Sequence, residues 1–172
     1  MAANTFTLIK SYTIGAAGAS TIDFISIPSI YTDLCVKISG RKTSTGGSNL
    51  QMQLNGTTSG YTQKTIIGGG SGTPVSYSDT SEIGYMYVTI SSETVNTFSS
   101  TDIYIPNYTT SNNKTISIDS VTENNATAAG QVFTVGTWAN AETINRVYFQ
   151  LANGAGVFAE YSTACLYGIK NS

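Results

Sequence analysis

Apolar and polar residues alternate along most of this chain, and clusters of Gly, Asn, Ser and Thr interrupt the alternation roughly every ten residues. Alternation with a period of two is typical of β-strands that bury one face, whereas helical spacing of apolar residues is nearly absent. In Asp33–Arg41, one side of the expected strand carries aliphatic residues and the other carries Cys35 and polar residues. In Asn49–Asn55, Leu and Met alternate with Gln, and Gly56 completes an Asn-Gly turn signal. The pattern therefore predicts an all-β chain.

The alternation predicts about eleven strands separated by short polar turns. The expected strands are Thr5–Ile14, Thr21–Ile27, Asp33–Arg41, Asn49–Asn55, Tyr61–Ile67, Glu82–Ile90, Phe98–Ile105, Lys114–Val121, Gln131–Gly136, Thr143–Leu151 and Tyr161–Ile169. Val147, Phe149 and Leu151 are expected to point into the core. The longest irregular stretch, Gly68–Asp79, is predicted to be a surface loop. Further loops are expected at Lys42–Ser48, Asn107–Asn113 and Thr122–Gly130, clustered at the ends of the fold.

Antiparallel strands in one domain must pair two sheets or close into a barrel to bury their apolar faces. The length of 172 residues fits a single domain spanning 1–172. We therefore predict a two-sheet antiparallel β-sandwich of jelly-roll type with about ten to eleven strands. An immunoglobulin-like sandwich is the alternative, but Cys35, Trp138 and Cys165 are spaced too widely for one such domain.

Charged residues make up only 10% of the chain, the net charge is −2, and histidine is absent. The 40% hydrophobic content argues against disorder, and only 8 Lys and Arg argue against a nucleic-acid-binding protein. Without histidine the chain lacks the commonest general base and transition-metal ligand. The composition predicts a protein that is not an enzyme, with no catalytic residue, metal site or cofactor. A glycosidase that uses two of the scattered carboxylates stays open as an alternative.

The start of the chain, Met1–Phe6, has neither a basic region nor an apolar run, so we expect no signal peptide. No apolar stretch approaches the roughly 18 residues that cross a bilayer, and no membrane partner is predicted. We expect the chain to be made in a cytosol and to stay there or be released by lysis. In that reducing compartment Cys35 and Cys165 are expected to be free side chains, buried or half-buried. A disulfide between these two cysteines is the alternative.

Aromatic residues are the one sequence feature that could support binding, because rings stack on sugars and are common at protein interfaces. Six of them are predicted to lie in or beside loops or on outward strand faces. These candidate contact residues are Tyr61, Tyr77, Tyr85, Tyr87, Tyr108 and Trp138. Ordinary β-sheet composition is the alternative explanation, since aromatic side chains suit pleated surfaces.

Three segments carry a resemblance to a known family: Tyr31-Thr-Asp-Leu34, Ile105-Pro-Asn-Tyr108 and Leu166-Tyr-Gly-Ile169. In this order, and with similar segments over nearly the whole chain, they resemble small virion structural proteins of tailed bacteriophages. The resemblance implies a β-sandwich or jelly-roll fold and a place in the phage particle, on the capsid or in the tail. It implies no catalytic residues.

Residues of the resembling segments also have expected physical roles. Pro28 and Pro106 end or edge a strand, because proline cannot donate to a β-ladder. Tyr31 and Tyr108 are expected to pack against the sandwich and to hydrogen-bond through their hydroxyl groups, as corner tyrosines do. Gly168 is expected to allow a close approach within the last strand.

The sequence thus predicts a capsid decoration, or cement, protein that stabilises the outer shell by bridging major capsid subunits. Its expected partners are the major capsid protein and further copies of itself, as a homo-oligomer such as a trimer. Its expected location is the virion, on the outer capsid surface or the tail, after synthesis in the host bacterial cytoplasm. The alternative function is a tail or fibre module that binds host surface polysaccharide.

Overall fold

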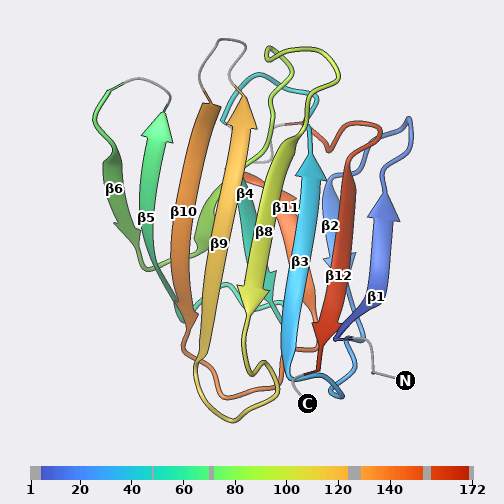
Figure 1. The fold of residues 1–172 in the computed structure, drawn as a ribbon, viewed down its shortest axis with the longest axis vertical. Coiled ribbons are helices and arrows are strands. Elements are labelled where there is room, and N and C mark those ends of the chain that lie inside the picture. Colours follow the sequence, from blue (N-terminus) through green and yellow to red (C-terminus); the bar gives the residue numbers. More distant parts are fainter. Residues whose placement is uncertain (1–4, 48, 70–71, 124–128, 153–155, 171–172) are drawn as a thin grey trace.

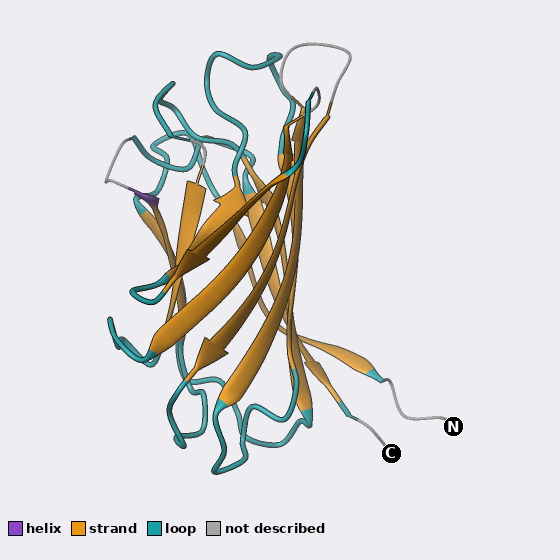
Figure 2. Ribbon diagram, turned by 90° about the vertical axis from the view of Figure 1, so that its left-hand side faces the viewer, coloured by secondary structure: helices purple, strands orange, loops and turns teal. Residues whose placement is uncertain are grey.

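A computed structural model describes residues 5–47, 49–69, 72–123, 129–152 and 156–170. Its strands form two antiparallel sheets stacked as two layers (Figures 1 and 2). The eight-stranded sheet has the order β1 (Phe6–Thr13), β12 (Thr163–Ile169), β3 (Asp33–Gly40), β8 (Ser99–Ile105), β9 (Lys114–Glu123), β10 (Ala129–Trp138), β5 (Tyr61–Gly69), β6 (Val75–Asp79). The four-stranded sheet has the order β2 (Thr21–Phe24), β11 (Val147–Leu151), β4 (Asn49–Leu54), β7 (Ile83–Tyr87). The predicted all-β, two-sheet sandwich is confirmed.

The strand order shows an eight-stranded jelly roll to which four further strands are added. In β1-β12-β3-β8 and β2-β11-β4-β7, strands that follow one another in the chain alternate between the two sheets, as in a jelly roll. The remaining strands, β9, β10, β5 and β6, continue the larger sheet beyond β8 and extend past the smaller one (Figure 1). We call these four strands the extension.

Every predicted strand overlaps an observed one, but the predicted loop Gly68–Asp79 is wrong in part, because it contains β6. The strand was missed because most of its residues are exposed and neither face is buried in the core, so no apolar face marks it. The loop predicted at Thr122–Gly130 is also shorter than expected, since β9 runs to Glu123 and β10 begins at Ala129. Parts of the predicted loops, namely 48, 70–71 and 124–128, lie outside the described residues.

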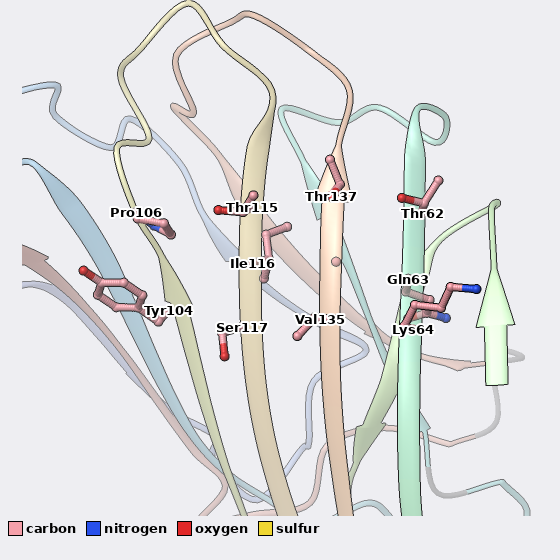
Figure 3. Close-up of a pocket in the computed structure, with 11 residues that line it drawn as sticks. Thr62, Gln63, Lys64, Tyr104, Pro106, Thr115, Ile116, Ser117, Val135 and Thr137 are labelled. Carbon is pink, nitrogen blue, oxygen red and sulfur yellow. The ribbon is translucent and has the colours of Figure 1, made fainter. Parts of the chain in front are cut away.

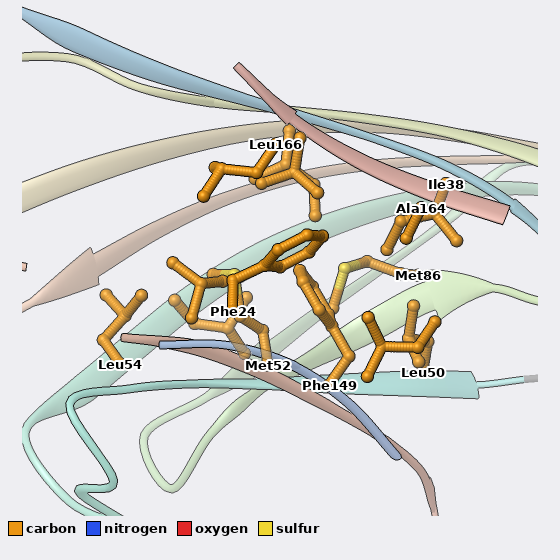
Figure 4. Close-up of a cluster of buried hydrophobic side chains, with 14 of the residues drawn as sticks. Phe24, Ile38, Leu50, Met52, Leu54, Met86, Phe149, Ala164 and Leu166 are labelled. Atoms are coloured by element: carbon orange, nitrogen blue, oxygen red, sulfur yellow. The ribbon is translucent and has the colours of Figure 1, made fainter. Parts of the chain in front are cut away.

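The core lies between the two sheets, where alternate residues of the jelly-roll strands meet (Figure 4). Val147, Phe149 and Leu151 of β11 are all buried, as the alternation predicts. The ring of Phe149 packs edge-on against Phe24 of β2, with centroids 6.5 Å apart. Met52 of β4 is buried in the same cluster. Burial of this apolar surface is the main stabilising contribution to the sandwich.

The inner face of the extension is polar where it covers the free edge of β7. Backbone groups of β7 that have no strand partner bond to side chains of the larger sheet. The Gly84 N–H donates to Gln63 Oε1 at 3.1 Å, and the Tyr87 N–H donates to Ser120 Oγ at 2.8 Å. These bonds explain why buried positions of β5 and β9 carry Gln and Ser, because an unpaired buried backbone group would be costly.

Two buried lysines stabilise loops at the ends of the sheets. The Lys114 ammonium group donates to the carbonyl oxygens of Thr110, Asn112 and Asn140 at 2.8, 2.6 and 3.3 Å. Lys42 donates in the same way to a carbonyl oxygen of its own loop. Burial lowers the pKa of both lysines. The carbonyl oxygens replace the water that each charge loses, so each lysine joins its loop to the end of a strand.

Two residues of the resembling segments, Tyr108 and Gly168, have the structural roles expected of them. Tyr108 is fully buried, and its hydroxyl group donates to the carbonyl oxygen of Pro28. Gly168 lies against the ring of Tyr31, where a Cβ atom would be only 2.2 Å from Cδ2 of that ring. The roles expected for Tyr108 and Gly168 are therefore confirmed, and both concern folding.

The two cysteines are free, as expected, and no disulfide joins them. Cys35 in β3 is buried and Cys165 in β12 is half-buried. The register pairs Cys35 with Tyr167 and Cys165 with Lys37, so the cysteines are diagonal rather than direct neighbours. Burial raises the pKa of the Cys35 thiol, which keeps it protonated and unreactive at neutral pH.

Candidate functional site

Three of the six predicted contact aromatics are buried, so their prediction as surface residues is wrong. Tyr61, Tyr108 and Trp138 are each 2% exposed or less. Tyr61 and Trp138 lie opposite one another on β5 and β10, with rings stacked at 6.3 Å. The Tyr61 hydroxyl also accepts a hydrogen bond from the Leu54 N–H at 2.8 Å. All three residues are close to loops in the sequence. Tyr61 and Trp138 are terminal residues of their strands and face inward, and Tyr108 turns into the core from its loop.

The other three predicted aromatics keep some exposure. Tyr77 of β6 is 47% exposed, and its ring stacks on Tyr85 of β7 with centroids 5.6 Å apart and planes within 4°. Tyr85 and Tyr87 are half-buried beneath the extension. Burial raises the pKa of Tyr87. The stacked pair joins β6 to the smaller sheet and leaves part of Tyr77 available for contact.

The main candidate surface was not predicted, and it lies on the outer face of the extension. We call Ile66, Val121, Phe133 and Val135 the apolar patch. The four side chains are between 38% and 56% exposed. Phe133 pairs directly with Ile66, and Val135 lies next to it on the same face of β10. Apolar groups gathered in this way on a solvent-exposed face form a candidate interaction site.

Two charged residues flank the apolar patch at opposite corners. Lys64 lies opposite Val135, and its ammonium group donates to the Ser78 hydroxyl at 2.5 Å. Asp119 lies opposite Phe133 on the other side of β10. In the described part of the chain, neither Lys64 nor Asp119 forms an ion pair. Further across the same face, Lys37 and Asp102 neutralise one another at 2.8 Å.

A groove of about 370 Å³ adjoins the apolar patch on the same outer face (Figure 3). Tyr104 and Pro106 of β8 and its following turn form one side, and β5 forms the other. The floor presents a row of hydroxyl groups, since the register aligns Thr62, Thr137 and Thr115 on three neighbouring strands. The groove therefore offers one aromatic ring and several hydroxyl groups to a ligand.

Tyr104 is held in place by a buried carboxylate. Its hydroxyl donates to Asp33 Oδ2 at 2.6 Å, and the Asn107 N–H donates to Asp33 Oδ1 at 2.8 Å. The hydrogen bond to Asp33 and some burial raise the pKa of Tyr104 to about 12. The Tyr104 hydroxyl therefore stays protonated and hydrogen-bonded to Asp33, so its ring is the part available to a ligand in the groove.

Among the described residues, no three Cys, Asp or Glu side chains gather as metal ligands would. The same part of the chain contains no helix that is long and apolar enough to cross a membrane. Comparison with protein-family models, curated proteins and solved structures finds no match to this chain. The outer face of the larger sheet is the candidate functional surface, because it presents apolar, aromatic and hydroxyl groups suited to binding.

Proposed function

We propose that this chain is a virion structural protein, a capsid decoration protein that acts as an oligomer and bridges major capsid subunits. The apolar patch is the observation that carries the assembly part of this proposal, because it is suited to contact with another protein chain, further copies of this one included. It lies on the strands that the chain adds to a jelly roll, and the jelly roll buries its own core without needing that outer face. An apolar outer face on an added element is explained if another protein covers it.

The low charge of the chain supports the same function. Burying an unpaired charge at an interface is costly, whereas hydroxyl groups and aliphatic side chains are desolvated at little cost. Only 10% of the residues are charged, and the outward positions of β5, β10 and β9 are mostly Thr, Ser and aliphatic residues, with Lys64 and Asp119 among them. The virion location is proposed from the sequence segments that resemble phage structural proteins.

A decoration protein stabilises a shell by binding only the assembled form. Each site filled at a hundredfold excess over Kd contributes about 2.7 kcal/mol to that form. The test compares particles from a deletion strain with particles to which the purified chain is added back. We expect the added chain to bind the deletion particles saturably and to raise the temperature at which the particles release their genome. Deletion particles that neither bind the chain nor gain heat stability would overturn it.

The groove favours a second candidate, a tail or fibre module that binds host polysaccharide. Tyr104 offers a ring for stacking on a sugar face, and the threonine row offers hydrogen bonds. Saturable binding of the purified chain to host surface polysaccharide, lost in Tyr104→Ala and kept in the control Tyr161→Ala, would support this function. Tyr161 is a suitable control because it is exposed and does not line the groove. Equal binding by both variants, or no binding by the wild type, would exclude it.

A further inference from the structure

The apolar patch and its flanking charges fit a second copy of the same chain. Lys64 lies beside Val135 and Asp119 lies beside Phe133, on opposite sides of β10. The line from Lys64 to Asp119 therefore crosses β10 between Val135 and Phe133. A twofold axis that lies between two facing sheets, perpendicular to this line, exchanges the Lys64 and Asp119 positions of the two copies.

We propose that two copies pair face to face through the outer faces of β5, β10 and β9 about this axis. Lys64 of each copy then meets Asp119 of the other, twice in one dimer. In the described part of the chain neither residue forms an ion pair, so pairing gives each charge a partner of opposite sign. The neighbouring Lys37 and Asp102 already neutralise each other and need none.

The shape of the patch also suits self-association. A hollow of about 260 Å³ lies beside Phe133, between Ile66 and the small side chains of Ser76 and Ser78 on β6. The twofold operation brings Phe133 of one copy over this hollow in the other. A ring that enters a hollow of the facing copy packs more closely than two flat faces would.

The size of the face limits the area that the dimer buries. Three strands about 4.8 Å apart, over roughly 20 Å of their length, give a face of about 300 Å² per copy. Two such faces bury about 600 Å², below the roughly 1,200 Å² of stable specific interfaces, so we expect a weak dimer that forms at high protein concentration.

The face-to-face dimer gives a specific form to the oligomer of the proposed function. Only the use of this dimer on the shell rests on that function. A dimer presents two identical surfaces away from the shared face. Each can bind one shell subunit, so the pair bridges two subunits with the added strength of bivalent binding. The pairing itself is measured without particles, so its failure and the failure of the proposed function are distinguishable.

The test is sedimentation velocity on the purified chain over a range of concentrations, first at low salt. The wild type is expected to shift from monomer to dimer, and salt is expected to weaken the dimer. The K64D and D119K variants are each expected to weaken self-association by about tenfold or more, because like charges then face each other. Val95→Glu is the matched control, since Val95 is exposed in a loop outside the patch.

Mixing the two charge variants gives the most specific result. K64D and D119K are expected to form a mixed dimer, since each position 64 then faces an opposite charge at position 119. The double variant K64D/D119K is expected to recover self-association. A wild type that stays monomeric at all concentrations would overturn the proposal. A dimer that tolerates both charge reversals, or a mixture that does not associate, would also overturn it.

Discussion

Replacing Lys114 with Met tests whether buried cations stabilise the loops of this fold. Lys114 is 1% exposed, and two of its carbonyl contacts are short, at 2.6 and 2.8 Å. A hydrogen bond to a charged group contributes about 1.5 kcal/mol at the lower limit, so the loss of two costs about 3 kcal/mol. Burial of the methionine side chain, which has a similar length, offsets about 1 kcal/mol of this loss. The expected net loss is therefore about 2 kcal/mol.

Urea denaturation and calorimetry measure this loss directly. For a chain of this size, about 2 kcal/mol lowers Tm by roughly 4–8 °C. Lys170→Met is the matched control, because Lys170 is exposed and lies outside the apolar patch. Its expected change is within about 0.5 kcal/mol. A Lys114→Met variant as stable as Lys170→Met would refute the reasoning, because the carbonyl contacts would then contribute no net stability.

Three further predictions concern single side chains. The wild type is expected to lose stability between pH 10 and about 12, because Tyr104 then ionises in the unfolded chain but not in the folded one; urea denaturation of Tyr104→Phe should lack this contribution. Ser120→Ala is expected to cost about 1–3 kcal/mol by leaving a β7 N–H unpaired, whereas Ser117→Ala on the exposed face of the same strand should be near neutral in the same assay. Gly168→Ala is expected to lower Tm strongly, because its Cβ would overlap the Tyr31 ring; a normal Tm would contradict this packing.

The sequence predicted those parts of the fold in which burial follows alternation. β4 and β11 alternate cleanly, and their inward residues are buried as expected. β6 escaped prediction because its residues are mostly exposed, so its pairing with β5 leaves no periodic apolar signal. Tyr61 and Trp138 were misplaced because a residue at the end of a strand looks like part of the adjoining loop.

The candidate surface could not be predicted, because its residues become neighbours only through the register in which the strands pair. Ile66, Phe133 and Val121 come from three strands, and only the pairing of β5 with β10 and of β10 with β9 makes them neighbours. One signal was present in the sequence. Val132 and Phe133 are adjacent apolar residues, as are Ile66 and Ile67, and adjacent residues of a strand point to opposite faces. One member of each pair therefore had to point outward.

The number of copies of this chain in each purified virus particle tests the central claim most directly. Quantitative mass spectrometry, with the major capsid protein as the internal reference, gives this ratio. A decoration protein repeats with the symmetry of the shell, so the account predicts on the order of hundreds of copies per particle. A count of only a few copies, or none, would contradict it.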